Sequence, residues 1–92
     1  MTTGFEWDEA KDDANRAKHG VGLAEAQEAF FDPHRLVFAD LAHGGSEERY
    51  FCLGMVGGRV LTVRFTWREG RIRLFGAGYW RKGRRIYERH RG

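Results

Sequence analysis

The segment from Arg59 to Tyr79 alternates apolar and polar side chains over two arms, with a break at Glu69 and Gly70. A period of two is typical of a β-strand with one buried face, because successive side chains point to opposite faces of the sheet. A short break that contains glycine predicts a β-hairpin. A chain of 92 residues can form one small domain, so we expect a single domain over residues 1–92 with this hairpin at its centre.

One face of the predicted hairpin carries arginines. Arg64 in the first arm and Arg71 and Arg73 in the second have the parity that places them on one side of the sheet, together with Tyr79. Guanidinium groups bind phosphate through forked hydrogen bonds, so this face suits a nucleic-acid backbone. The alternative is that the arginines only keep a solvent-exposed face soluble.

The charges of the chain are divided unevenly along its length. The first 48 residues contain eleven Asp or Glu and four Lys or Arg, whereas the last 44 contain two and twelve, which gives net charges of −7 and +10. A concentrated basic region is the electrostatic signature of a polyanion-binding protein. The alternative is that the acidic half neutralises the basic half in the folded domain.

The remaining patterns predict an α+β domain, with two N-terminal helices packed on a four-stranded antiparallel meander and a basic C-terminal helix. Asp8 and Gly20 are expected to cap the first helix, and the second covers about Leu23 to Phe31. Because one face of the sheet is apolar, we expect the helices to cover it and to leave the opposite face open. The remaining elements are strands over residues 35–40 and 49–56, the two hairpin arms, and a helix over about 81–90.

The first predicted helix has two distinct faces. A narrow apolar stripe consists of Ala10, Ala14 and Ala17. A polar stripe runs beside it, and its members are Lys11, Asn15, Lys18 and His19. Such a stripe would suit contact with a phosphodiester, but a solvated helix commonly carries similar residues without a function.

Several classes of protein are not supported by the sequence. No run of about 18 apolar residues is present, and the acidic N-terminal segment does not resemble a signal peptide, so we expect no membrane contact and a cytoplasmic location. Cys52 is the single cysteine and is expected in the core. The four histidines are not at metal-ligand spacings, and one cysteine cannot complete a zinc site, so we expect no metal and no other cofactor.

The segment FEWDEAKDDANRAKHGVGLAEAQEAFFDP resembles the N-terminal signature of the BrnT toxin family, and the resemblance continues through LVFAD, RYFCLG, VLTVRFTWREGRIRLFGA and RKGRRIYE. It therefore covers nearly the whole chain. It implies a fold similar to that of RelE-type ribonuclease toxins, and a type II toxin that inhibits translation by cutting RNA. It also implies a BrnA-type antitoxin with a ribbon-helix-helix part, which neutralises the toxin and binds the operator DNA of the shared operon.

The chain departs from this family pattern at two glycines. Gly22 stands where many members have serine, and we expect it to change only a helix cap. Gly78 stands where many members have arginine, and it is followed by Tyr79 and Trp80. If that arginine takes part in cleavage, either Arg81 or Lys82 replaces it here or this chain is a weaker nuclease.

Cleavage of RNA without a metal requires a proton acceptor or donor near the 2′-hydroxyl and positive charge at the phosphate. We predict His19 as the acid or base, because an imidazole exchanges protons near neutral pH. Arg64 and Arg73 are predicted to stabilise the phosphorane. The predicted backbone contacts are Lys11, Lys18, Arg71, Arg81 and Lys82. Tyr79 and Trp80 would stack on an unpaired base, or they pack at the rim of the core instead.

A second function remains compatible with the same residues. The chain would then be a non-catalytic module that binds nucleic acid or its antitoxin and acts as a corepressor. Both hypotheses need the basic face, but only the ribonuclease needs the imidazole of His19 for its chemistry.

Overall fold

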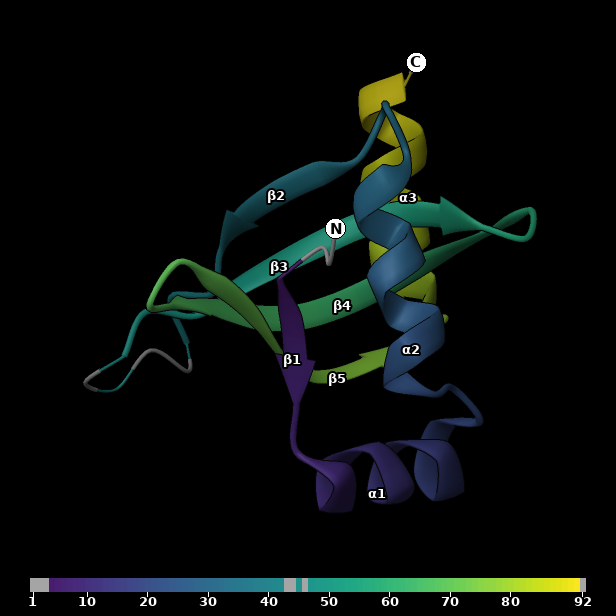
Figure 1. Cartoon of the computed structure of the whole chain (residues 1–92). Helices are drawn as coiled ribbons and strands as arrows, with labels where there is room; N and C mark the ends of the chain where they lie inside the picture. The colour runs from purple at the N-terminus through teal and green to yellow at the C-terminus, as the bar shows by residue number, and fades with distance from the viewer. Residues whose placement is uncertain (1–3, 43–44, 46, 92) are drawn as a thin grey trace.

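The computed structural model describes residues 4–42, 45 and 47–91, which form three helical segments around one sheet (Figure 1). Its five strands are β1 (Phe5–Trp7), β2 (Leu36–Ala39), β3 (Tyr50–Val56), β4 (Arg59–Arg68) and β5 (Arg71–Gly78). The helices are α1 (Glu9–His19), α2 (Leu23–Ala26) with the 3-10 helix η1 (Gln27–Phe31), and α3 (Arg81–Arg91). None of the helices in the described part of the chain is long and apolar enough to cross a membrane.

The sheet has the order β1-β5-β4-β3-β2. The predicted antiparallel meander from β2 to β5 is confirmed. The predicted count of four strands is wrong, because β1 adds a fifth strand that pairs in parallel with β5 and aligns Glu6 with Arg73. Phe5 and Trp7 pack against the core on either side of Glu6, so this three-residue segment has the alternation of a strand but not the usual length of one.

One face of the sheet is covered by α2 and η1, which lie in front of it in Figure 1. The close approach of η1 requires Gly54 in β3, because a Cβ at this position would overlap the backbone of Ala29. Leu23 and Ala26 from α2 are fully buried here. They pack with Cys52, Leu61, Val63, Phe65, Leu74 and Ala77 from the sheet.

The sequence led us to expect that the opposite face of the sheet is open. This prediction is wrong, because α3 packs across β3 and β4 from behind (Figure 1). Gly83 is the reason that the helix comes so close. A Cβ at Gly83 would overlap the side chain of Thr62 and lie 3.2 Å from a methyl group of Leu53. Tyr87 is 1% exposed and forms a second small core with Leu53 and Val60. The basic helix is therefore an integral layer of the domain rather than a mobile tail.

The helix α1 lies along the edge of β5, just beyond the point where β1 ends. Asn15 is buried, and its amide donates to the carbonyl of Ala77 while its carbonyl accepts from the Ala77 N–H, at 2.9 and 3.1 Å. The side chain thus continues the backbone pairing that β1 begins. The alanine stripe of α1 is exposed, and the buried members of the helix are Asn15 and Asp12. The face of α1 that packs on the sheet is therefore polar, and the apolar stripe of alanines faces the solvent instead.

The turn between α1 and α2 is held by Asp12. Gly20 ends α1 in a left-handed conformation, as predicted, and Gly22 is the N-cap of α2 without a side-chain hydrogen bond. Asp12 replaces that missing cap, because its Oδ1 accepts from the N–H of Leu23 at 2.7 Å. The same carboxylate forms an ion pair of 3.0 Å with Arg16. Gly22 therefore stands at a helix cap, which is the position that the sequence predicted for it.

Candidate active site

His19 and Trp80 come from different elements and meet edge to face. His19 is the last residue of α1, and Trp80 lies between β5 and α3. Their ring centroids are 5.1 Å apart and their planes cross at 88°, a geometry that aromatic pairs favour. The pair brings the C-terminal end of α1 to the end of β5.

Gly78 makes this contact possible. A Cβ at Gly78 would lie 2.5 and 2.6 Å from two atoms of the Trp80 indole, far inside van der Waals contact. A side chain at position 78, including the arginine that many members of the resembled family carry, is therefore incompatible with the observed position of Trp80. In this chain the indole occupies space that such a side chain would need.

A hollow of about 210 Å³ lies on one side of the His19–Trp80 pair. We call it the Arg64 hollow, and its lining residues are Lys11, Ala14, Asn15, Lys18, His19, Arg64, Phe75, Gly76 and Trp80. Five of the residues that were predicted to bind or cut RNA therefore meet here. Arg64 is half-buried in β4, whereas Lys11, Lys18 and His19 are exposed on α1. The hollow thus combines an imidazole, a guanidinium and two ammonium groups at the surface.

Arg73, the other predicted catalytic arginine, does not line the Arg64 hollow. It forms an ion pair of 3.1 Å with Glu6, and Arg71 pairs with the other oxygen of the same carboxylate at 2.9 Å. The hydrogen bond from Arg73 holds the pKa of Glu6 below its usual value, although burial acts in the opposite direction. The parallel register of β1 with β5 thus gives both arginines a partner within the chain.

Arg49, the residue just before β3, is an arginine that the sequence analysis did not single out. Its guanidinium lies 4.5 Å from the ring centroid of Phe75, which lines the Arg64 hollow. Its Nε is buried and has no hydrogen-bond partner among the described residues. The cation–π contact holds the guanidinium of Arg49, a further positive charge, beside the hollow. Pairing Tyr50 with Phe65 in the predicted meander would have placed this residue on the face of Arg64.

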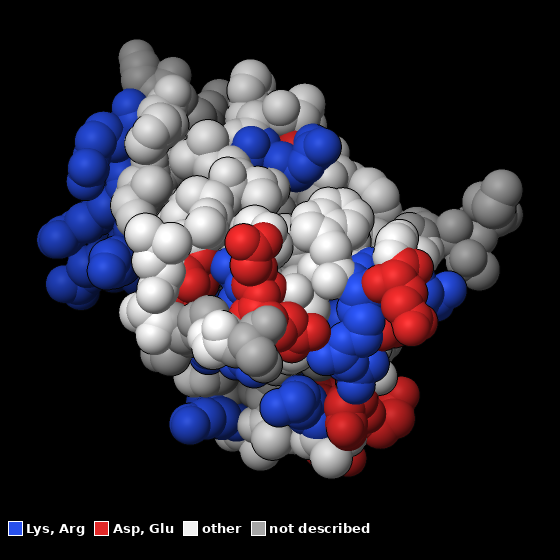
Figure 2. All heavy atoms as spheres, turned by 90° about the vertical axis from the view of Figure 1, so that its left-hand side faces the viewer, with Lys and Arg blue, Asp and Glu red and all other residues white. Residues whose placement is uncertain are grey.

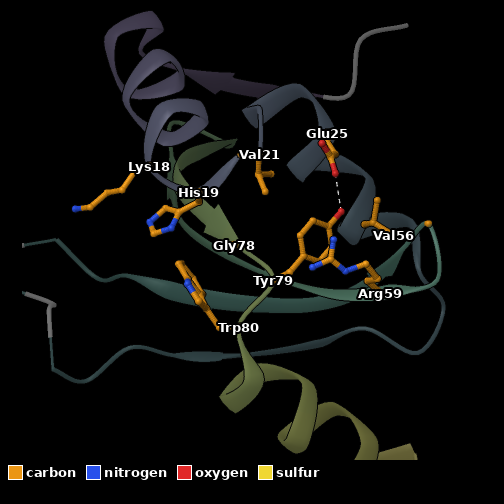
Figure 3. A pocket seen from close by; sticks show the side chains of 11 residues that line it. Lys18, His19, Val21, Glu25, Val56, Arg59, Gly78, Tyr79 and Trp80 are labelled. Atoms are coloured by element: carbon orange, nitrogen blue, oxygen red, sulfur yellow. Dashed lines mark hydrogen bonds between the residues drawn. The ribbon is translucent and has the colours of Figure 1, made fainter.

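A second hollow, of about 610 Å³, lies on the other side of the His19–Trp80 pair (Figure 3). We call it the Tyr79 hollow, and its lining residues are Lys18, His19, Gly20, Val21, Glu25, Val56, Gly57, Arg59, Gly78, Tyr79 and Trp80. The two hollows therefore share Lys18, His19 and Trp80. Figure 3 shows His19 and Trp80 on one side of the Tyr79 hollow and Tyr79 with Arg59 on the other.

Tyr79 is held by two polar contacts. Its hydroxyl donates to Oε2 of Glu25 on α2 at 2.5 Å, and the guanidinium of Arg59 lies 4.0 Å from the centre of its ring. Burial, together with the hydrogen bond to Glu25, raises the pKa of Tyr79 to about 12, so the phenol stays protonated near neutral pH. Tyr79 packs on the α2 side of the sheet, so the prediction that it shares the face of Arg64 is wrong.

Arg81 and Lys82 are exposed in the first turn of α3, outside both hollows. Arg81 lies beside a third hollow with Arg84 and Arg59. Lys82 borders an apolar hollow whose lining includes Phe38. Both residues follow Trp80 directly along the chain, and they place two cations next to the shared wall of the main hollows.

The described part of the chain contains neither a cluster of metal-ligating side chains nor a reactive thiol. No group of three or more His, Cys, Asp or Glu side chains among the described residues is placed to hold a metal ion. Cys52 is fully buried, and this burial raises the pKa of its thiol to about 12, which leaves it protonated and unreactive. Cys52 is therefore a core residue, as the sequence predicted.

A comparison with models of protein families matches residues 7–83 to the family described as the ribonuclease toxin BrnT of type II toxin–antitoxin systems. The matched range extends from β1 into the first turn of α3 and includes the residues that line both hollows. A search of curated proteins found no match.

Proposed function

The chain belongs to the BrnT family of ribonuclease toxins of type II toxin–antitoxin systems, and from this premise we propose that it is a metal-independent endoribonuclease that acts in the Arg64 hollow. The observation that carries this proposal is the meeting of His19 from α1 with Arg64 from β4 in one hollow, beside Lys11 and Lys18. Family membership supplies the class of activity, and these side chains supply groups that suit its chemistry.

The proposed reaction uses the 2′-hydroxyl of the RNA as the nucleophile. Neutral His19 accepts the proton of this hydroxyl, and O2′ forms a bond to the adjacent phosphorus. The bond between phosphorus and the 5′-oxygen of the next nucleotide breaks, and this oxygen takes a proton from water. The products are a 2′,3′-cyclic phosphate and a 5′-hydroxyl, and His19 returns its proton to the solvent.

The cations of the site act on the phosphate. Half-buried Arg64 stabilises the charge of the phosphorane through forked hydrogen bonds, whereas exposed Lys11 and Lys18 contact the flanking backbone. We assign Arg73 to the path of the RNA rather than to the reacting phosphate, because its guanidinium already binds Glu6. The other residues on that path are Arg71, Trp80, Arg81 and Lys82.

The type II family also implies an antitoxin as partner and RNA as substrate. We propose that the antitoxin is a BrnA-like ribbon-helix-helix protein, which neutralises this chain in the cytoplasm and carries the complex to operator DNA. Glu6 already pairs with Arg71 and Arg73 within the chain, whereas Arg64, the lysines of α1 and the cations at the start of α3 are offered to RNA or to the antitoxin.

The experiment that tests the proposed function is cleavage of a long unstructured RNA by the purified protein in EDTA. We expect the wild type to cut, and we expect His19→Ala and Arg64→Ala each to lower the rate by about 10²-fold or more. His34→Ala is a matched control, since His34 lies in the turn before β2, and it should cut like the wild type. Arg68→Ala is the control for Arg64, because Arg68 shares its strand but pairs with Glu47.

Two results would contradict the proposal. Full activity of His19→Ala would remove the imidazole from the chemistry. A wild type that binds RNA but leaves it intact, both free and on ribosomes, would favour the non-catalytic corepressor.

A further inference from the structure

The Tyr79 hollow has no role in the proposed cleavage, although it adjoins the site of cleavage. Lys18, His19 and Trp80 line both hollows, so a strand of RNA whose phosphate lies at Arg64 continues past this shared wall. The next nucleotide along the strand then reaches the Tyr79 hollow. Its volume of about 610 Å³ falls within the range of pockets that bind small organic groups.

The sides of the Tyr79 hollow are flat groups that suit a planar ligand. The indole of Trp80 stands with His19 on one side, and the guanidinium of Arg59 lies against the Tyr79 ring on the other (Figure 3). Proteins commonly hold unpaired bases of RNA between aromatic rings and guanidinium planes. Gly78 lies between the two sides in Figure 3, and its missing side chain lets the indole of Trp80 take its place in the wall, because a Cβ there would overlap the ring.

The polar groups of the hollow can distinguish one base from another by hydrogen bonds. Glu25 offers carboxylate oxygens, and the hydroxyl of Tyr79 donates to Oε2 of this carboxylate and so orients it. Arg59 offers a fork of N–H donors at the other side of the same ring. Guanine presents two adjacent donors, N1–H and the 2-amino group, which match a carboxylate, and its O6 and N7 are acceptors that match an arginine. Among the standard bases, only guanine has two adjacent donors on one edge together with two acceptors on the neighbouring edge.

We propose that the Tyr79 hollow is a guanine-selective base subsite, in which Glu25 and Arg59 choose the nucleotide next to the scissile phosphate. This inference rests on the proposed ribonuclease function, since it names the sequence that the same site cuts. The base lies against the indole of Trp80, its amino edge faces Glu25, and its O6 and N7 face the N–H groups of Arg59. Lys18 at the shared wall contacts a phosphate that flanks the scissile one.

The test is the cleavage pattern on an RNA library randomised at both positions beside the cut. We expect the wild type to enrich guanine at one of these two positions by about tenfold or more. Replacing this guanine with inosine, which lacks only the 2-amino group, should slow cleavage by a similar factor. Glu25→Gln should cut the guanosine and inosine substrates at equal rates, and Arg59→Met should lose most of the enrichment.

Glu28→Gln is the matched control. Glu28 is an exposed carboxylate of η1 close enough to influence Tyr79, but it does not line the hollow. This variant should retain both the rate and the guanine enrichment of the wild type. No base preference in the wild type, or a preference that survives both Glu25→Gln and Arg59→Met, would overturn the proposed subsite.

A binding measurement separates the failure of the subsite from a failure of the proposed function. Guanosine 5′-monophosphate should shift the NMR signals of Tyr79 and Trp80, and inosine 5′-monophosphate should bind about tenfold more weakly. These shifts are expected even if the protein cuts no RNA, in which case only the ribonuclease proposal fails. Equal binding of the two nucleotides would reject the subsite whether or not RNA is cut.

Discussion

Gly78 determines where the side chain of Trp80 can lie. Because no Cβ is present at this position, the indole folds back over the end of β5 and meets His19 edge to face. The exposed imidazole at the end of α1 thereby gains a fixed neighbour. Trp80 is in this account a positioning residue for His19, and the glycine is the reason that it can act as one.

We therefore expect Gly78→Ala to lower RNA cleavage by about tenfold or more, because the new methyl group displaces Trp80 and frees the His19 ring. The protein should remain folded, since the backbone of Gly78 is that of a strand. Single-turnover rates measure the loss, and the ring-proton shifts of His19 in an NMR spectrum report the departure of the indole.

Gly22→Ala is the matched control for Gly78→Ala. A Cβ at Gly22 would have its nearest neighbour at 3.4 Å, which is an ordinary contact. This variant should cut at the rate of the wild type. An active Gly78→Ala protein with unchanged His19 shifts would mean that Trp80 does not position the imidazole.

The sequence singled out some residues of the candidate site and missed others. The difference is whether a residue is marked by a local pattern or only by contacts between distant segments. The parity of the hairpin and the period of the first helix singled out Arg64 and His19, which line one hollow in the structure, because each signal is local. Glu25 and Arg59, which line the Tyr79 hollow, were not singled out, since their link through Tyr79 requires α2 and β4 to be placed together in space. The partner of Arg73 was missed for the same reason, because Glu6 lies far away along the chain.

At the scale of elements, the side-chain amide of Asn15 joins α1 to the edge of β5. Asn15 exchanges two hydrogen bonds with the backbone of Ala77 and donates a third to the carbonyl of Val21. A buried N–H and carbonyl at the edge of β5 are satisfied in this way without another strand. The position of His19 therefore depends on a polar contact made four residues earlier in the helix.

We expect Asn15→Ala to lower the free energy of unfolding by about 2–4 kcal/mol, since it leaves the N–H and carbonyl of Ala77 buried without their partners. Urea denaturation measures the change. Ala17→Ser, on the exposed side of the same helix, should stay within about 0.5 kcal/mol of the wild type. A loss below about 1 kcal/mol for Asn15→Ala would show that α1 is held mainly by other contacts.

Asp32 joins three elements through one carboxylate. Its oxygens accept from the N–H of His34, the N–H of Met55 on β3 and the hydroxyl of Tyr87 on α3. Burial would raise the pKa of Asp32, but these hydrogen bonds, led by that from Tyr87, hold it below its usual value near 3.8. The carboxylate is thus favoured in the folded state, and it holds α3 to the sheet.

This contact predicts a dependence of stability on pH. Because the pKa of Asp32 is lower in the folded state, its stabilisation is fully present above about pH 5 and decreases as the pH falls through the folded value below 3.8. Asp32→Asn should cost about 2 kcal/mol at neutral pH and progressively less in acid. Denaturation curves from pH 7 to pH 3 measure the difference, and a constant gap between the two proteins would contradict the assignment.

The fold was predictable where the periodicity extends over many residues. The hairpin of β4 and β5 and the caps of α1 at Asp8 and Gly20 follow from local signals that the structure confirms. The strand β1 was not predicted because three residues give too short a pattern. The packing of α3 was not predicted because its cause, the missing side chain of Gly83, matters only once Thr62 lies opposite.

For the molecule as a whole, the sequence allowed either a concentrated basic region or neutralisation of the basic half by the acidic half. Both arrangements occur, in different parts of the surface. Acidic and basic side chains are mixed over the central part of the face in Figure 2. Ion pairs of this kind join Glu6 to Arg71 and Arg73, and Glu47 to Arg68. Basic side chains gather without acidic neighbours along the edge of that view where α3 lies. The first turn of α3 contains no acidic residue, so its cations add to the positive end of the helix dipole beside Trp80.

We expect this concentration of charge to appear in the salt dependence of RNA binding. Arg81→Ala combined with Lys82→Ala should lower the slope of log affinity against log salt by about 1.4, which is about 0.7 for each lost contact with a phosphate of a single strand. Arg68→Ala, at the far end of the hairpin and paired with Glu47, should leave the slope unchanged. An equal slope for all three proteins would remove α3 from the path of the RNA.

The measurement that tests the central claim most directly is the chemistry of the cut ends. An RNA oligonucleotide and the same sequence with 2′-deoxyribose throughout are incubated with the protein in EDTA, and the products are identified by mass. Attack by the 2′-hydroxyl with His19 as base predicts 2′,3′-cyclic phosphate and 5′-hydroxyl ends from the RNA and no cleavage of the deoxy strand. Ends with a 5′-phosphate, or cleavage that appears only when a divalent metal is added, would contradict it.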